Sequence, residues 1–307
     1  MKEAGKTAAV MVLYNPDWDV TTRAINMLLP QVDHLCLIDN SPDADHSARF
    51  KENPDISYFP LGRNAGIAAA QNVGVGRISK MGYDYILFSD QDSEAPLDVV
   101  EKLLTASEEL ESRGVRVAAV GTRAFNKVTG TIYRENSKHV DNDNKRGEQM
   151  RQICSDLDVT EYYSVRSSIS LISTRVMKEV GEFDESLFID GVDHEWCWRA
   201  WHKSGRRSFI VEKARIDHML GEGDREVMGE KVSIPSPFRV YYQFRNYLWL
   251  RKRKYVPSYW KKQQGMRYML KALYYPIMVA PRHKYLKNIF RGVREGLSSP
   301  RRQRKRK

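Results

Sequence analysis

The chain has 307 residues, of which 41% are hydrophobic and 10% aromatic, and its formal net charge is +11. This length and composition fit one large globular α/β domain with an appendage, and the three scattered cysteines argue against a disulfide framework or zinc cluster and favour a reducing cytoplasm. The charged N-terminus argues against a signal peptide, and no apolar run approaches the roughly 18 residues of a membrane-spanning helix.

The charge is distributed unevenly along the chain. Residues 235–307 contain 21 Lys and Arg and a single acid, Glu295, so this part carries a net charge of +20 and residues 1–234 carry −9. The acidic part would not attract nucleic acid along its surface, whereas the basic part can lie on anionic lipid or on phosphate. The alternative from another class is a nucleic-acid-binding protein that acts through this tail, and it predicts salt-sensitive binding to any duplex.

The first part of the chain alternates apolar runs with segments of helical spacing. Short apolar runs bounded by Asn, Asp, Pro or Gly are typical of strands, and apolar residues three or four positions apart are typical of helices. The predicted strands are 7–14, 34–38, 56–59, 83–89 and 115–120, and the predicted helices are 20–29, 67–80 and 96–112. This order predicts an α/β fold with a parallel, right-handed, doubly wound sheet.

The middle of the chain is less regular. A polar stretch at 125–160 predicts an insertion or mobile loop over the site, with a hairpin near residues 129–130. The helix predicted at 174–180 should end at Gly181, because glycine is the usual residue after a helix C-terminus. The remaining predictions are strands at 165–172 and 208–211, helices at 174–180 and 189–202, and a glycine-containing loop at 218–229.

Two segments of the basic tail have amphipathic patterns. Residues 238–250 interleave aromatic and basic side chains, and residues 259–279 alternate apolar and basic positions at helical spacing. Such helices can lie in a membrane interface with their cations at the lipid phosphates. Alternatively, they can pack on the domain with Lys and Arg in solvent. Residues 301–307 are expected to be disordered.

Two carboxylates follow the fourth predicted strand. The run from Tyr85 to Phe88 predicts a buried strand, and Asp90 and Asp92 come after it, one residue apart. In an extended backbone these side chains would point the same way, and ligands of open α/β sheets bind beyond the carboxyl ends of the strands. Two hard oxygen donors suit Mg²⁺ or Mn²⁺ held together with a diphosphate. The alternative is that Asp92 or Ser93 caps the following helix.

Seven motifs, taken in order, resemble those of glycosyltransferase family 2, and within it those of bacterial rhamnosyltransferases that use dTDP-L-rhamnose. They cover roughly residues 7–250, and their order makes chance agreement a poor explanation. The motifs are Tyr14-Asn15-Pro16, Asp39-Asn40-Ser41, Arg63-Asn64-x-Gly66-Ile67-Ala68-x-Ala70-x-Asn72-x-Gly74, Asp90-Gln91-Asp92-Ser93, Gly181-x-Phe183-Asp184-Glu185-x-Leu187-Phe188-Ile189-Asp190, Asp193-x-Glu195-Trp196 and His218-x-x-Gly221.

The resemblance implies a GT-A fold and an inverting, metal-dependent transfer from a nucleotide sugar. It implies a GT-A domain at 1–234, with a nucleotide-sugar half at about 1–122 and an acceptor half at about 123–234, followed by a basic, helical, membrane-associating extension at 235–307. The implied donor is dTDP-L-rhamnose, with another nucleotide sugar (UDP- or GDP-linked) as the alternative.

The same resemblance implies further partners. The cofactor would be Mn²⁺ or Mg²⁺. The acceptor would be a hydroxyl of a cell-surface polysaccharide intermediate linked to undecaprenyl diphosphate. The enzyme would be cytoplasmic and peripheral on the inner face of the cell membrane, on an anionic lipid surface. Nucleic acid is not an expected partner, because residues 1–234 are acidic and contain no recognised nucleic-acid-binding module.

Most of the motif residues match positions that bind the nucleotide sugar in the family. Asp39 would accept a hydrogen bond from a pyrimidine base, and Arg63 and Asn64 would meet the diphosphate or the sugar. Turn chemistry is the alternative for the Asn-Pro and Asp-Asn-Ser-Pro segments, and a solvent-facing position is the alternative for Asn72. The expected nucleotide-sugar-binding residues are Tyr14, Asn15, Pro16, Asp39, Asn40, Arg63, Asn64, Gly66, Asn72, Asp90, Gln91 and Arg245.

The metal would be held by Asp92 with support from Asp90, and would neutralise charge on the leaving nucleoside diphosphate. His218 would be the third protein ligand, because imidazole suits Mn²⁺ and the glycines after it let the loop close. A structural role is the alternative for a lone histidine.

Inversion needs one base to deprotonate the acceptor hydroxyl. Asp193 matches the base of the family motif, and Asp190 and Glu195 are candidates for its support. Glu195 would orient the base, contact the acceptor or pair with Arg199. The same segment contains three tryptophans, Trp196, Trp198 and Trp201, which can stack on a sugar or lie in the core. We expect two of the three to lie in the core.

Overall fold

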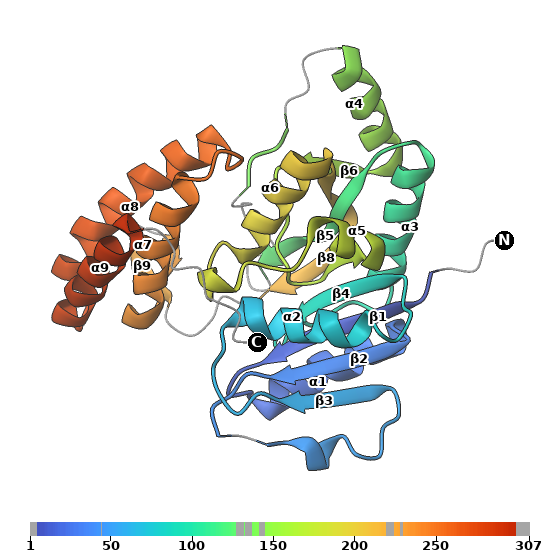
Figure 1. Ribbon diagram of the computed structural model, residues 1–307, viewed down its shortest axis with the longest axis horizontal. Helices are drawn as coiled ribbons and strands as arrows, with labels where there is room; N and C mark the ends of the chain where they lie inside the picture. Colours follow the sequence, from blue (N-terminus) through green and yellow to red (C-terminus); the bar gives the residue numbers. More distant parts are fainter. Residues whose placement is uncertain are drawn as a thin grey trace.

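In the part of the chain that the structure describes, eight strands form one mixed sheet at the centre of the molecule (Figure 1). The computed structural model describes residues 5–43, 45–126, 132, 137–140, 145–218, 224–227 and 230–298. The strand order is β3-β2-β1-β4-β7-β5-β8-β6. The strands are β1 (Thr7–Leu13), β2 (His34–Asp39), β3 (Ile56–Pro60), β4 (Tyr85–Asp90), β5 (Val117–Asn126), β6 (Val159–Tyr162), β7 (Ser170–Ser173) and β8 (Arg207–His218).

The predicted doubly wound half of the sheet is confirmed. Strands β3, β2, β1 and β4 are parallel neighbours, and α1 (Trp18–Leu28), α2 (Ile67–Ile78) and α3 (Val99–Ser112) connect them to each other and to β5. Successive residues of β1 alternate between two buried clusters, so that Val10 packs with α2 on one face and Met11 packs with α1 and α3 on the other. Both faces of the sheet are therefore covered, as parallel strands require.

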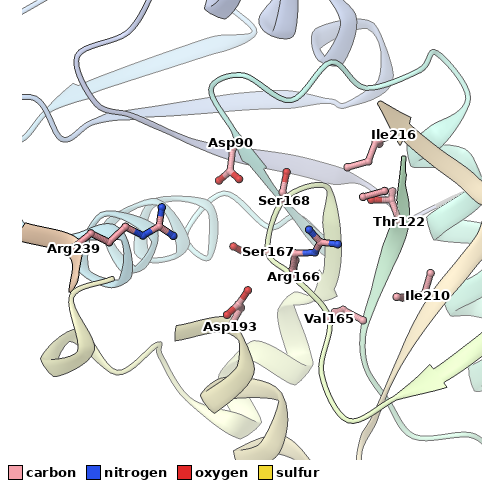
Figure 2. Close-up of a pocket in the computed structure, with 11 residues that line it drawn as sticks. Asp90, Thr122, Val165, Arg166, Ser167, Ser168, Asp193, Ile210, Ile216 and Arg239 are labelled. Carbon is pink, nitrogen blue, oxygen red and sulfur yellow. The ribbon is translucent and has the colours of Figure 1, made fainter. Parts of the chain in front are cut away.

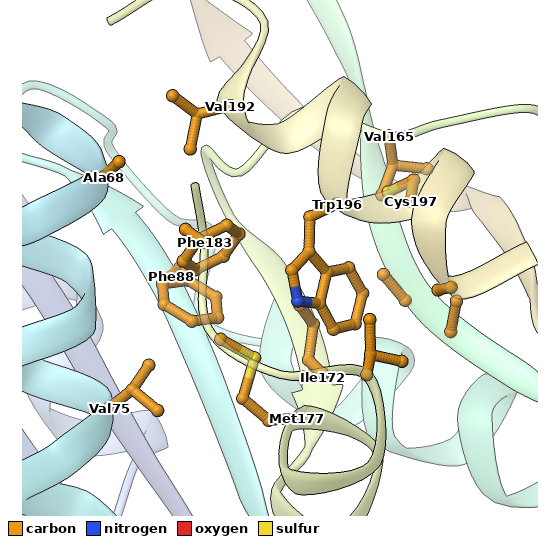
Figure 3. Packing of buried hydrophobic residues seen from close by; sticks show 14 of the residues in the cluster. Ala68, Val75, Phe88, Val165, Ile172, Met177, Phe183, Val192, Trp196 and Cys197 are labelled. Carbon is orange, nitrogen blue, oxygen red and sulfur yellow. The ribbon is translucent and has the colours of Figure 1, made fainter. Parts of the chain in front are cut away.

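The face of the sheet that carries α2 also carries α5 (Thr174–Val180) and α6 (Val192–Ser204). Trp196 of α6 is buried here beside Phe183 and close to Met177 and Ile172 (Figure 3). Trp196 and Trp198 are both fully buried and Trp201 is partly exposed, so the expectation of two core tryptophans is confirmed. Large aromatic side chains supply much of the apolar area that fixes α6 on the sheet.

The second half of the chain departs from the predictions. Strand β7 is shorter than the predicted strand at 165–172 and runs antiparallel to both β4 and β5. Strand β8 is longer than the predicted strand at 208–211 and runs on to His218. The polar stretch at 125–160 contains α4 (Lys145–Leu157), whose Ile153 packs into the core, and the hairpin predicted near 129–130 falls outside the described residues.

Three short 3₁₀ helices and a separate two-stranded sheet complete this part of the molecule. They are η1 (Leu29–Gln31), η2 (Ser47–Arg49) and η3 (Glu185–Leu187), and the antiparallel pair β9 (Asp224–Val227) and β10 (Glu230–Ser233). Strand β9 lies inside the segment 218–229 that was predicted as a glycine-containing loop, and β10 follows directly after it. Helix α5 ends at Gly181, as predicted.

Three helices follow at one side of the domain (Figure 1): α7 (Pro237–Arg251), α8 (Ser258–Met278) and α9 (Arg282–Leu297). Helix α9 lies against α7 at close range, because a Cβ at Gly292 or Gly296 would stand 2.5 Å from the Tyr241 carbonyl oxygen or 2.7 Å from Leu248 Cβ. Helix α7 is therefore largely buried. For residues 238–250 the structure shows the second of the two expected arrangements, a helix that packs on the domain. No described helix is long and apolar enough to cross a membrane.

Candidate active site

A cavity of about 210 Å³ opens beyond the carboxyl end of β4. Asp90 and Asp193 point into it from opposite sides, and the guanidinium of Arg239 reaches toward it from a third (Figure 2). The lining consists of Asp90, Thr122, Ala124, Val165, Arg166, Ser167, Ser168, Asp193, Ile210, Ile216 and Arg239. Strand β4, helix α6 and helix α7 thus bring together charged residues from three distant parts of the chain.

The cavity favours a cation or a proton at Asp90. Burial, followed by the negative charge of Asp92 and assisted by that of Asp193, raises the pKa of Asp90 to about 6. Ser168 counters this by a hydrogen bond to the carboxylate. A bound cation would relieve the repulsion between these carboxylates.

Asp92 does not line the cavity. The chain turns after β4, with the Ser93 N–H donating to the Asp90 carbonyl at 3.2 Å, so Asp90 and Asp92 do not share one extended run. Asp92 is exposed. The capping alternative is wrong, because α3 begins only at Val99, with Asp98 in the N-cap position.

A three-residue metal site cannot be assembled from the described side chains. Among them, no group of three or more His, Cys, Asp or Glu is placed to hold a metal ion. The backbone of His218 ends β8, where it pairs with Asn126 of β5. The His218 side chain, and the glycines that follow it, lie outside the described residues.

Asp190 is held by an arginine that the sequence analysis did not single out. The helix predicted at 189–202 begins at Val192, so Asp190 lies in the preceding turn, where its φ is +64°. Its two carboxylate oxygens accept hydrogen bonds from Arg239 Nη2 at 2.8 Å and Nε at 3.0 Å. This bidentate pair joins the first turn of α7 to the turn before α6.

Glu195 is buried, with 1% of its side chain exposed, and does not line the cavity. It accepts hydrogen bonds from Arg199 Nε at 2.9 Å and from the Tyr255 hydroxyl at 2.6 Å, and it forms an ion pair with Arg253 Nη1 at 3.0 Å. Of the three roles expected for Glu195, the structure contains the pair with Arg199. Contact with a substrate would require this network to open.

The edge formed by the ends of β1, β2 and β4 is braced by side chains of the motifs. Gln91 acts as a clamp, since its Oε1 accepts from the Tyr14 N–H at 2.7 Å and its Nε2 donates to the Tyr14 carbonyl at 3.2 Å. The Asn15 N–H donates to Ser41 Oγ at 2.8 Å. Tyr14 and Asn15 themselves remain exposed and Pro16 partly so, so this edge offers surface for a base or a sugar.

A second clamp fixes the segment before α2. Asn40 donates to Asn64 Oδ1 at 3.1 Å and accepts from the Ala65 N–H at 2.7 Å. Gly66 follows with φ +86°, and a Cβ there would stand 2.5 Å from the Phe188 ring, so only glycine fits. Arg63, in contrast, is exposed at this edge and keeps its guanidinium available for an anion.

The placement of Asp39 corrects one expectation. Its carboxylate is fully enclosed and accepts from Tyr58 at 2.6 Å, His46 at 2.8 Å and the Ser41 N–H at 2.9 Å. Burial alone would raise the pKa of Asp39, but these hydrogen bonds outweigh it and hold the pKa below its usual value. Asp39 therefore organises the end of β2 and presents no free oxygen to a base.

Asn72 and Arg245 also have structural roles in place of the expected ligand contacts. Asn72 is buried in α2, where its amide exchanges two hydrogen bonds with the backbone of Phe183, at 2.9 and 3.0 Å. Arg245 is buried in α7 and donates to the Ser186 carbonyl at 2.6 Å and the Leu187 carbonyl at 3.1 Å. Neither residue lines the cavity.

The site also contains residues that the sequence analysis missed. Arg166, Ser167 and Ser168 form a loop before β7, inside a segment predicted as a strand. Arg239 lies in an aromatic and basic segment that also contains Arg245, and the sequence pattern does not distinguish which of the two arginines belongs to the site. Only the turn of α7 decides which of the two arginines faces the cavity.

The parallel half of the sheet and the residues at its edge agree with one protein family. A model of glycosyl transferase family 2 matches residues 8–168, more than half of the chain. The chain belongs to glycosyltransferase family 2. The match includes Asp90 and Asp92, whereas Asp193 and Arg239 lie beyond it, so the second side of the cavity comes from parts of this glycosyltransferase that the family model does not reach.

The similarity to characterised proteins extends further along the chain. The glycosyltransferase is 29% identical over 254 residues to the dTDP-rhamnosyl transferase RfbF of Shigella flexneri, and the matched region covers 81% of each chain. TarS of S. aureus (residues 1–349), solved in complex with UDP-GlcNAc, has a TM-score of 0.55 at 14% identity and covers 94% of this chain and 81% of its own.

GalNAc-T7, solved with UDP, GalNAc and Mn²⁺, has a TM-score of 0.58 at 14% identity, over 87% of this chain. The glycosyltransferase spans only 55% of the length of that chain. At such identities these likenesses concern the fold alone, and they confirm the predicted GT-A fold.

Proposed function

We propose that this glycosyltransferase moves L-rhamnose from dTDP-L-rhamnose to an acceptor hydroxyl, with inversion at the anomeric carbon. The observation that carries the proposal is the cavity that Asp90 and Asp193 share at the carboxyl end of β4. The relative RfbF supports the choice of donor, since it is a dTDP-rhamnosyl transferase. A UDP-sugar donor is the alternative, which the UDP-sugar complex of TarS favours.

Asp193 would act as the base. It takes the proton of the acceptor hydroxyl while that oxygen attacks the anomeric carbon, and the bond to the nucleoside diphosphate breaks on the opposite face. Asp193 stands in the first turn of α6, and its Oδ1 accepts a hydrogen bond from the His194 N–H at 2.8 Å. A single carboxylate of this kind is sufficient for inversion.

Asp90 and Asp92 would hold Mn²⁺ or Mg²⁺, with the rest of the coordination shell left to donor phosphate and to His218. The donor set fits a hard divalent cation, because both groups are carboxylates, and the pKa of Asp90 is raised first by burial and then by the nearby charge of Asp92. When bound, such a cation neutralises charge on the leaving diphosphate. Mn²⁺ in the GalNAc-T7 structure supports this choice.

Arg239 is the cation of α7 that would meet the diphosphate. Its guanidinium lines the cavity while Asp190 holds it in place, and a planar fork of donors suits phosphate oxygens. Arg63 is a second candidate, because it is exposed at the same edge of the sheet.

We propose a lipid-linked polysaccharide intermediate as the acceptor, with the enzyme peripheral on the inner face of the cell membrane.

Donor turnover tests the chemistry without a known acceptor. With dTDP-L-rhamnose and Mn²⁺, we expect slow release of dTDP and rhamnose, and Asp193→Asn should reduce it by roughly 10²–10⁴-fold. Asp19→Asn is the matched control, since Asp19 is an exposed aspartate in the first turn of α1. Full activity of the Asp193→Asn variant would sink the assigned role. In a panel of nucleotide sugars, the true donor should raise the melting temperature most.

A further inference from the structure

Large apolar side chains are exposed in unusual number on α8 and α9. Of the fourteen exposed large hydrophobic side chains in the described part of the chain, nine lie on these two helices. They are Met266, Met269, Leu270, Leu273, Ile277, Met278, Leu286, Phe290 and Leu297. A contiguous group of this kind marks a surface that binds something, whereas single exposed apolar residues need no explanation.

The exposed side chains of α8 form one stripe along the helix. Five of them recur at intervals of one, three or four residues from Met266 to Ile277, and between 55% and 62% of each is exposed. At about 100° per residue these positions fall on a single face, opposite the buried Tyr275. An apolar helix face that is exposed in this way is available to bind a partner.

The stripes of the two helices meet at a groove of about 610 Å³. Met266 and Met269 of α8 form one wall, and Val293 and Leu297 of α9 form the other. The floor is α7, including Tyr247, and its lining is mainly apolar. The exposed faces of α8 and α9 are therefore parts of one apolar surface, which we call the α8/α9 surface.

Cations surround the α8/α9 surface. Arg251, Lys261 and Lys262 line the groove near one end of α8. Exposed cations also follow α9, namely Arg282, Lys284, Lys287, Arg291 and Arg294. With Glu295 as the one acid from residue 235 onward, a symmetric contact with the same surface of a second copy would bring like charges together. An apolar face rimmed by cations complements an anionic bilayer, with side chains at the acyl boundary and cations at the phosphates.

We propose that the α8/α9 surface docks this glycosyltransferase on an anionic phospholipid bilayer. The helix that joins it to the chemistry is α7, whose Arg239 lines the catalytic cavity and whose Tyr247 lies under the groove. These two residues are separated by about 12 Å along the helix axis. Docking would therefore hold the cavity close to the membrane, and its use in the cell rests on the proposed lipid-linked acceptor.

Vesicle sedimentation tests the proposal with neither donor nor acceptor present. The full chain should bind vesicles of phosphatidylcholine with phosphatidylglycerol, bind pure phosphatidylcholine much more weakly, and leave the anionic vesicles at high salt. Leu273→Glu with Ile277→Glu should weaken binding by roughly tenfold or more, since two apolar side chains no longer enter the interface. The milder pair Leu273→Gln with Ile277→Gln should lie between, provided both pairs melt like the parent.

Met81→Glu with Leu97→Glu is the matched control, because these two apolar residues are exposed on the catalytic domain, far from α8 in the sequence, and binding should not change. Equal binding by the Leu273 and Ile277 variants and the parent would overturn the proposal. So would a concentration-dependent dimer in sedimentation velocity that these variants dissociate, with no vesicle binding by the parent. Vesicle binding by Asp193→Asn, together with its loss of donor turnover, separates this proposal from the proposed chemistry.

Discussion

Replacement of Glu195 tests whether this residue stabilises the fold or takes part in the reaction. Glu195→Ala removes the carboxylate that Arg199, Arg253 and Tyr255 share. Breaking a buried ion pair costs about 3–5 kcal/mol. We expect the lower end, about 3 kcal/mol, because Arg199 and Arg253 keep 16% and 18% of their side chains exposed and both retain other acceptors.

Thermal and urea unfolding of the variant measure this cost. For a chain of this size, about 3 kcal/mol lowers the melting temperature by roughly 5–10 °C. Donor turnover well below that temperature should stay within about threefold of the parent, because Glu195 does not line the cavity. Arg175→Ala, which breaks an exposed ion pair with Glu111, should cost at most about 1 kcal/mol.

The reasoning fails if Glu195→Ala melts like the parent while its turnover falls by orders of magnitude. That result would return Glu195 to the active site as a partner of Asp193. Tyr255→Phe refines the measurement, because it removes one hydrogen bond to Glu195 and should cost about 1 kcal/mol.

Four other perturbations have definite expected outcomes. Asn72→Ala leaves the backbone N–H and carbonyl of Phe183 buried without partners, and urea unfolding should report a loss of about 2–4 kcal/mol. Gly66→Ala forces a Cβ into Phe188 at positive φ, so both the melting temperature and donor turnover should fall, whereas a parent-like variant would contradict the close contact. Arg239→Ala should raise the KM for the donor by roughly tenfold or more, and an unchanged KM would exclude a diphosphate contact. The control is Arg23→Ala, because Arg23 is an exposed arginine of α1 that forms an ion pair with Glu94. Excess chelator should abolish turnover without lowering the melting temperature, and restored activity on addition of Mn²⁺ completes that test.

The parallel half of the fold was predictable because its local and global signals agree. Each strand of that half is a short apolar run, each connecting helix has one apolar face, and parallel pairing follows from the alternation. The position of the site was predictable for the same reason, since the carboxyl ends of parallel strands lie at the same edge of a sheet. Asp39 and Asp90 accordingly lie at one edge, opposite Leu13 and Val12 of β1.

The role of each side chain at that edge was not predictable. Asp39 and Asp90 both follow buried strands, but Tyr58 and His46 enclose the first, while the second faces an open cavity. These partners come from other segments, and no local pattern specifies them. Arg239 and Arg245 differ in the same way, because their positions on α7 differ by six residues and hence point to different sides of the helix.

The grip of α7 on the turn before α6 bears on where this protein can be divided. The Asn246 amide donates to the carbonyls of Leu187, Ile189 and Asp190, at 2.8, 2.6 and 3.0 Å. A polypeptide shortened to end at residue 234 would lose that brace, and with it the aromatic wedge of Trp249 that belongs to the same buried cluster as α6. The minimal catalytic unit would then have to extend through α7 and on to Trp260, because Arg253 and Tyr255 bind Glu195 of α6 and Trp260 packs on Trp198.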